Sequence, residues 1–132
     1  MSEQNIEIVR RIHEAWGREG TPIGSGLLDP EVEWVNPPDA VEKGVRRGLD
    51  EFGRAAESVE ETFRPRLEIE RIAAVGDEVV VIATLHGRGT GSGLEVARRQ
   101  GYVWTIHDGK AVRFRWFNEP RRALEAVGLA DG

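Results

Sequence analysis

The chain has 132 residues, a net charge of −5 and no cysteine. This length fits one domain, residues 1–132, that is large enough to bury a hydrophobic core. The acidic balance disfavours nucleic acid and acidic membrane surfaces as partners, and the lack of thiols excludes disulfides and thiolate metal sites. The N-terminal residues lack the basic-then-apolar layout of a signal peptide, and no segment is long enough to span a bilayer. We therefore expect a cytoplasmic protein with no membrane partner.

Helices dominate the first half of the predicted structure and strands the second. Apolar residues at helical spacing predict helices from Ser2 to Gly17 or Gly20 and over residues 22–28, 49–63 and 121–127, the second of them irregular because of its glycines. Alternating patterns and apolar runs predict strands over residues 31–36, 67–75, 79–86, 102–107 and 110–118. The order predicts an α+β fold in which helices cover one face of a curved sheet, built from a four-strand antiparallel meander with the early strand added.

Residues 102–118 give the clearest hairpin signal, because Asp108-Gly109 joins two runs of β-branched and aromatic residues. The Asp-Gly pair suits a type I′ turn, which needs positive φ at both central positions. Alternation puts Tyr102, Trp104, Ile106, Val112, Phe114, Trp116 and Asn118 on one face, and Val103, Thr105, His107, Arg113, Arg115 and Phe117 on the other. We expect the aromatic face to line a pocket and the mixed face to contact a second copy of the chain.

Two sequence patterns can be compared with known cofactor and metal motifs, and neither matches. Gly87, Gly89, Gly91 and Gly93 recur at every second position before a strand, which is neither the spacing nor the setting of a dinucleotide-binding loop. The histidines at positions 13, 86 and 107 have no helical i, i+4 partner and no nearby carboxylate cluster. We therefore predict no cofactor and no metal site.

Three segments carry a resemblance to a known family. They read N-I-E-I-V-R-R-I-H-E-A-W, L-L-D-P-E-V-E-W-V-N-P and H-D-G-K-A-V-R-F-R-W-F-N-E-P-R-R-A-L-E-A-V-G-L. The chain resembles the SnoaL-like branch of the nuclear transport factor two-like superfamily over essentially its whole length. The resemblance implies a cone-like fold, in which a curved, mostly antiparallel sheet wraps around the N-terminal helix and leaves a deep cavity, and it implies a homodimer. It fixes no function, because this scaffold hosts enzymes, binding proteins and assembly domains.

The residues that serve enzymes of this superfamily are mostly replaced here. The resemblance places the catalytic residues of steroid isomerases at three positions. Their oxyanion-binding tyrosine falls at Ile12, their general-base aspartate at Asn36, and their protonated aspartic acid at about Tyr102. For limonene epoxide hydrolase, the strand aspartate falls at Trp116, the arginine at about Thr84 and the second aspartate at about His86. Its water-holding tyrosine falls at Trp34 and its water-holding asparagine at Asn36. The aspartate of polyketide cyclases falls near Asn118. These replacements disfavour isomerase and epoxide-hydrolase chemistry.

The remaining candidates are one histidine, two amides and a set of aromatic side chains. His86 shares a strand face with Thr84, and on the cavity side it would be the histidine placed to act as an acid or base near neutral pH. The predicted ligand-binding residues are Trp34, Asn36, Thr84, Tyr102, Trp104, Phe114, Trp116 and Asn118. The rings would bind a flat apolar ligand through contact area and stacking, and the amides would orient a carbonyl or hydroxyl group.

Three functions stay open on the sequence alone. The first is a domain that binds a small, largely apolar molecule. The second is an isomerase, cyclase or hydrolase that acts on a small polyketide- or steroid-like substrate with His86 as the acid or base. The third is a homodimeric interaction domain whose cavity is filled by its own side chains. The scarcity of carboxylates at the strand positions expected to face the cavity favours the first.

Overall fold

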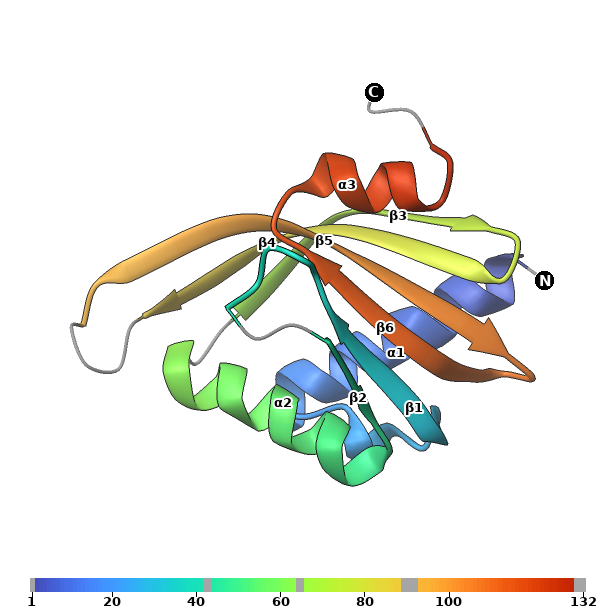
Figure 1. The fold of residues 1–132 in the computed structure, drawn as a ribbon, viewed down its shortest axis with the longest axis horizontal. Coiled ribbons are helices and arrows are strands. Elements are labelled where there is room, and N and C mark those ends of the chain that lie inside the picture. The colour runs from blue at the N-terminus through green and yellow to red at the C-terminus, as the bar shows by residue number, and fades with distance from the viewer. Residues whose placement is uncertain (1, 42–43, 64–65, 89–92, 130–132) are drawn as a thin grey trace.

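The computed structural model describes residues 2–41, 44–63, 66–88 and 93–129 (Figure 1). Its elements within these ranges are α1 (Ser2–Glu19), the 3-10 turn η1 (Ile23–Ser25), β1 (Leu28–Asn36), β2 (Gly44–Arg47), α2 (Leu49–Phe63), β3 (Arg66–Val75), β4 (Glu78–Arg88), β5 (Glu95–His107), β6 (Lys110–Phe117) and α3 (Pro120–Ala126). The strands form one sheet in the order β2-β1-β6-β5-β4-β3. The predicted α+β class with a mostly antiparallel sheet is confirmed.

One parallel pair joins the two ends of the chain within this sheet. Strands β3 to β6 follow one another as antiparallel neighbours. Strand β1 instead lies parallel to β6, with Trp34 opposite Phe114, and pairs antiparallel with β2 on its other edge. The parallel pair therefore brings aromatic residues from distant parts of the sequence side by side.

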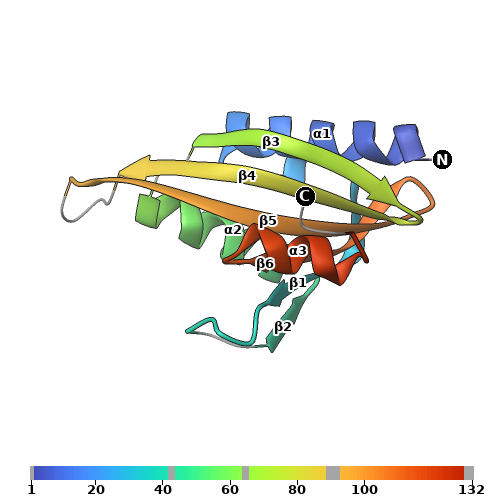
Figure 2. The same ribbon diagram turned by 90° about the horizontal axis from the view of Figure 1, so that it is seen from above.

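The helices lie on both faces of the sheet. Figure 2 shows α1 and α3 on opposite sides of the curved strands. The larger core contains Val9 and Ile12 from α1, Phe52 from α2, and Val79 and Val81 from β4, so we call this side of the sheet the inner face. On the outer face, α3 covers a second core of Val80, Ile82, Val103, Ala123, Leu124 and Val127. The expectation that helices cover one face is thus incomplete, because α3 covers part of the other.

The packing of α3 depends on a glycine in β5. A Cβ atom built on Gly101 would lie 2.4 Å from the Cβ atom of Ala123 and 3.3 Å from the Cα atom of Pro120. Side chains do not fit at such distances, so glycine here allows the helix to approach the strand.

The central hairpin has the turn that the sequence predicts. Asp108 and Gly109 have φ angles of 50° and 78°, the positive values that a type I′ turn requires. A bulge between Thr105 and Ile106 shifts the register, so Ile106 faces Ala111. Ala111, not Val112, therefore contributes to the inner core.

The helix predicted over residues 22–28 was wrong, and one short strand was not predicted. The segment predicted as a helix over residues 22–28 contains only the short turn η1, because Gly26, in the left-handed conformation, ends it. The predicted loop through Lys43 is followed by the four-residue edge strand β2, which sequence patterns did not indicate. Gly89 and Gly91, from the alternating glycines, lie outside the described residues. None of the described helices is long and apolar enough to cross a membrane.

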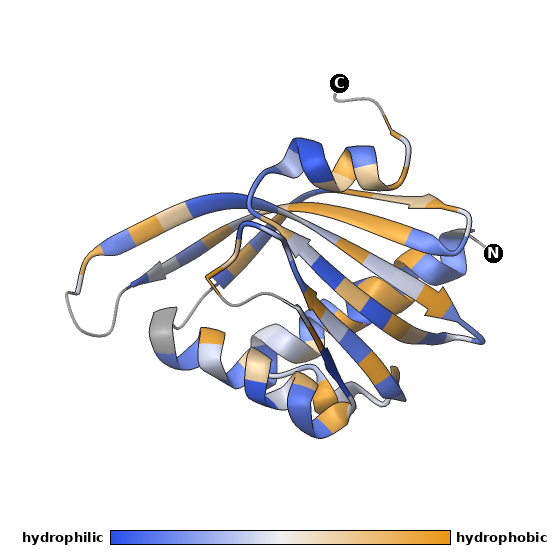
Figure 3. Cartoon of the chain, viewed as in Figure 1, coloured by the Kyte–Doolittle hydropathy of each residue, from blue (hydrophilic) through white to orange (hydrophobic). Residues whose placement is uncertain are grey.

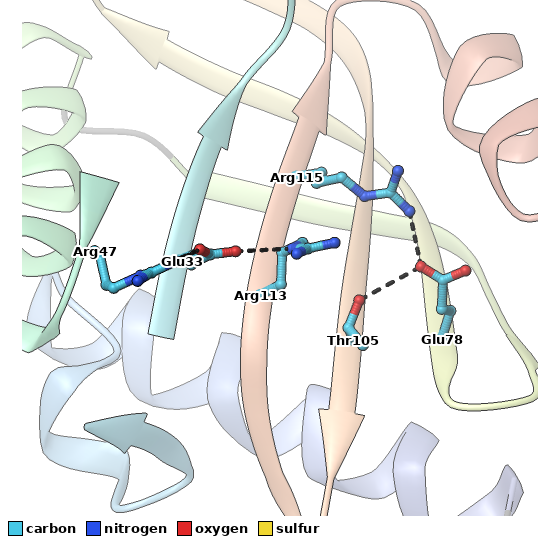
Figure 4. Close-up of polar contacts among 6 residues, drawn as sticks. All are labelled: Glu33, Arg47, Glu78, Thr105, Arg113 and Arg115. Carbon is cyan, nitrogen blue, oxygen red and sulfur yellow. Dashed lines mark hydrogen bonds and ion pairs between the residues drawn. The ribbon is translucent and has the colours of Figure 1, made fainter. Parts of the chain in front are cut away.

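The outer face beyond α3 carries paired charges (Figure 4). Glu33 on β1 accepts from Arg47 on β2 at 2.6 Å and from Arg113 on β6 at 3.0 Å, and the two guanidinium groups lower the pKa of its carboxyl. Glu78 on β4 likewise accepts from Arg115 at 2.7 Å. In Figure 3, hydrophilic and hydrophobic residues alternate along β1 and β6, as expected for strands with one apolar face.

Candidate functional site

A cavity of about 1170 Å³ opens between the inner face of the sheet and the helices α1 and α2. Its wall draws on both helices, all six strands and the loop after β1. The lining residues are Arg10, His13, Glu14, Trp16, Gly17, Trp34, Asn36, Ala40, Val41, Arg46, Ala55, Ser58, Val59, Glu60, Arg66, Leu67, Ile69, Ile72, Leu85, Gly87, Val96, Arg98, Gln100, Tyr102, Phe114 and Trp116. The fold therefore provides a site large enough for an organic molecule.

The interior wall of the cavity is aromatic. Trp34 from β1 and Phe114 from β6 pack with their ring centroids 4.8 Å apart, as their parallel pairing requires. Trp16 from α1 lies 5.9 Å from Trp34 and 5.6 Å from Phe114, and Tyr102 lies 5.4 Å from Phe114. Rings fixed in this way by their neighbours present apolar area to a ligand at little entropic cost.

Asn36 connects two of the cavity's tryptophans. Its Oδ1 atom accepts hydrogen bonds from Nε1 of Trp34 at 2.8 Å and from Nε1 of Trp116 at 2.7 Å. An indole N–H can only donate, so these two bonds fix which end of the amide is the oxygen. The amide nitrogen of Asn36 has no hydrogen-bond partner among the described residues.

His13 is the histidine of the cavity wall. It lies on α1, is 8% exposed, and its ring stacks against Trp16 at 5.8 Å with an interplanar angle of 4°. Its Nε2 atom accepts a hydrogen bond from Nε1 of Trp104 at 3.0 Å. Burial lowers the pKa of His13 to about 4, so the imidazole is neutral at physiological pH.

A second polar pair lies on β5. The hydroxyl of Tyr102 donates to Oε1 of Gln100 at 2.9 Å, and both side chains are buried. Burial raises the pKa of the Tyr102 phenol, so this hydroxyl stays protonated. The pair provides a fixed polar point beside the aromatic wall.

The more exposed part of the wall is rich in arginine. Arg10, Arg46, Arg66 and Arg98 contribute to it, against the carboxylates of Glu14 and Glu60. Val41, a fully exposed apolar side chain, also lies there. The entrance is thus locally positive, although the whole chain is acidic.

Five of the predicted ligand-binding residues come together in this wall: Trp34, Asn36, Tyr102, Phe114 and Trp116. Trp104 is fully buried behind the wall, where it contacts His13, Trp16 and Phe114. Asn118 follows the end of β6 and does not line the cavity.

The expected positions of His86 and Thr84 on the cavity side are wrong. Leu85 and Gly87 line the cavity, so their neighbours in β4 point to the outer face. There Nε2 of His86 lies 3.0 Å from Oε1 of Glu68, and Oγ1 of Thr84 donates to Glu70 at 2.7 Å. The sequence did not reveal this orientation, because β4 carries apolar residues on both of its faces and those on the outer face are covered by α3.

Sequence reasoning missed His13 and Gln100 as cavity residues. A signal for His13 was present, because it follows Val9 by four residues and precedes Trp16 by three, which puts it on the apolar side of the helix. Gln100 shares its strand parity with Tyr102, so the same alternation indicated its face. Trp16 packs against the core between helix and sheet and also lines the cavity.

Comparisons with known proteins give the same fold. The sequence matches the profile of the SnoaL-like domain over residues 9–114. A candidate SnoaL-like polyketide cyclase from Jannaschia sp. CCS1 has a TM-score of 0.80 at 23% identity, over 96% of this chain and 93% of that chain. TerC, crystallised with polyporic acid, has a TM-score of 0.74 at 26% identity, over 94% and 97%. An LEH-like epoxide hydrolase of M. tuberculosis has a TM-score of 0.70 at 17% identity, over 96% and 90%. No curated protein matches the sequence significantly.

Proposed function

The chain belongs to the SnoaL-like domain family, and we propose that it binds a small, flat, largely apolar molecule in its central cavity. The observation that carries this proposal is the cavity of about 1170 Å³ with Trp16, Trp34, Phe114 and Trp116 in its wall. Ligand sites are typically concave, mostly apolar and supplied with a few fixed polar groups. The co-crystallisation of TerC with polyporic acid supports the binding of an organic ligand on this fold.

The two other functions have less support. An interaction domain whose cavity is filled by its own side chains does not account for the open volume. The position of His86 does not fit a catalytic role in the cavity, because His86 pairs with Glu68 outside it. The carboxylates of the wall, Glu14 and Glu60, come from the helices, and the wall's strand residues contribute none.

Fluorene, a flat tricyclic hydrocarbon with no polar atom, is a suitable probe for this proposal. We expect it to bind saturably with one molecule per chain and to quench tryptophan fluorescence. Trp116→Ala should weaken binding about tenfold, because it removes aromatic area that the ligand would cover. Isothermal titration calorimetry provides the affinities.

His86→Gln is the matched control, since His86 lies on the outer face of the sheet. This variant should bind fluorene as the wild-type protein does. A wild-type protein without saturable binding, or a Trp116→Ala variant with unchanged affinity, would contradict the cavity as the binding site.

We also propose that the outer face contacts a second copy of the chain. The expected contact residues were Val103, Thr105, Arg113, Arg115 and Phe117. Val103 is fully buried beneath α3 and cannot contribute, and Phe117 is partly buried against the same core. The charged residues around Glu33, Arg113 and Arg115 are what remains to form the contact.

A further inference from the structure

Three tryptophan N–H groups determine which polar atoms Asn36 and His13 have left for a ligand. Trp34 and Trp116 donate to Asn36, and Trp104 donates to His13. Each of these indoles uses an acceptor atom of a side chain that lines the cavity. Since an indole has no acceptor to offer in return, the polar atoms left to Asn36 and His13 are hydrogen-bond donors.

For His13 the hydrogen bond from Trp104 fixes the tautomer. A neutral imidazole has one protonated and one unprotonated nitrogen. Nε2 must be unprotonated to accept from Trp104 at 3.0 Å, so the proton is on Nδ1. The lowered pKa of His13 agrees with this neutral form.

Both donors are open to the cavity. Neither Nδ1 of His13 nor Nδ2 of Asn36 has a partner among the described residues. In the described part of the chain, Nε of Arg115 is the only buried side-chain nitrogen or oxygen without a partner. The two unpartnered donors of His13 and Asn36 are therefore not fully buried. An unpartnered polar atom that is not buried, in a residue of the cavity wall, is available to a bound molecule.

We propose that the cavity selects a flat molecule with an acceptor oxygen, a carbonyl or deprotonated hydroxyl, which the Asn36 amide and the Nδ1–H of His13 recognise. The arginines of the entrance, Arg10, Arg66 and Arg98, favour the same electron-rich oxygen. This inference rests on the proposed binding function and adds the class of ligand. A ligand with only an N–H donor at that position would put its donor against the donors of Asn36 and His13, and no hydrogen bond would form.

Three probes with one ring skeleton test this selectivity. Fluorene has a methylene group at the central position, fluorenone a carbonyl acceptor and carbazole an N–H donor. Fluorenone should bind about tenfold more tightly than fluorene, because one hydrogen bond is made, and carbazole should bind more weakly than fluorene. The carbonyl stretching band of bound fluorenone should shift to lower frequency.

Asn36→Asp provides the matched variant. One carboxylate oxygen can still accept from Trp34 and Trp116, while the other replaces the amide donor with an acceptor. The preference should then reverse, with carbazole bound more tightly than fluorenone. A loss of stability alone would weaken all three probes alike, so the reversal reports the role of the amide in recognition.

Long-range proton–nitrogen NMR spectra report directly which nitrogen of His13 carries the proton. Protonation at Nδ1, with a shift of this signal on addition of fluorenone, supports the proposal. Protonation at Nε2 overturns it, and so does equal affinity for the three probes, which would leave the proposed binding function intact. Absence of binding by all three probes would instead contradict the proposed function itself.

Discussion

The indole nitrogen of Trp116 donates to Oδ1 of Asn36 over 2.7 Å, and this bond joins β6 to the end of β1. Because Trp34 donates to the same oxygen, one amide orients two rings of the cavity wall. The bond is therefore structural, and it also fixes which end of the Asn36 amide is left without a partner among the described residues.

Asn36→Ala should lower the free energy of unfolding by about 1–3 kcal/mol, because two partly buried donors lose their acceptor. Urea denaturation measures the change. Asn118→Ala is the control, since the described structure gives its side chain no hydrogen bond, and it should change stability by less than about 0.5 kcal/mol. Equal effects of the two substitutions would refute the role of Asn36.

His13 should make stability depend on pH. Its pKa is about 4 in the folded protein against 6.5 normally, so between these values the unfolded chain binds a proton that the folded chain does not. The contribution of neutral His13 to the free energy of unfolding should be fully present above pH 6.5. It should be lost as the pH drops towards 4, by about 3 kcal/mol in total. His13→Gln, which can still accept from Trp104, should remove this part of the slope between pH 7 and 5. His107→Gln, at an exposed position, should keep it.

Gly101→Ala should destabilise the protein by about 1–3 kcal/mol, because its Cβ atom would clash with Ala123. Adding Ala123→Gly should recover part of the loss, and thermal unfolding of the double-mutant cycle measures the coupling. Gly17→Ala is the matched control, since nothing lies within 4 Å of that Cβ position. It should be neutral or slightly stabilising, because alanine favours the helix. Additive effects at positions 101 and 123 would exclude the clash.

A dimer formed through the outer face should be sensitive to salt. The contact would depend on charged groups such as Arg113 and Glu33, which pair within one chain. The attraction of these groups to charges of the second copy is screened as ionic strength rises. Light scattering at micromolar concentration should give the mass of two chains at low salt and a smaller mass at high salt. Arg113→Glu should favour the single chain, and Arg54→Glu, on α2, should not. The mass of one chain under all conditions would exclude this dimer.

Residues 102–118 could be predicted well because their structure is local. The turn at Asp108 and Gly109 fixes the hairpin, but the bulge between Thr105 and Ile106, which the sequence does not display, is what brings Tyr102 opposite Trp116. The aromatic cavity wall follows from this register. The orientation of β4 could not be predicted, because Val80 and Ile82 are as apolar as Val79 and Val81, and only the position of α3 separates the two faces.

The polar part of the site depended on contacts that a sequence does not display. His13 meets Trp104 across a separation of 91 residues, and this contact decides which of its nitrogens carries the proton. The indole N–H groups that orient Asn36 belong to two different strands. Alternation indicates a face, but the direction of a hydrogen bond requires the three-dimensional structure.

The parallel pairing of β1 with β6 has a consequence for synthesis of the protein. The partners Asn36 and Trp116 are 80 residues apart. During translation β1 can pair with β2 soon after it emerges, but it leaves the ribosome long before β6 exists, and contacts over such separations form slowly. Strands β3 to β5 can pair as they emerge, but the aromatic wall forms only after β6 has left the exit tunnel. The cavity is therefore completed only after strands β1 to β5 have been synthesised.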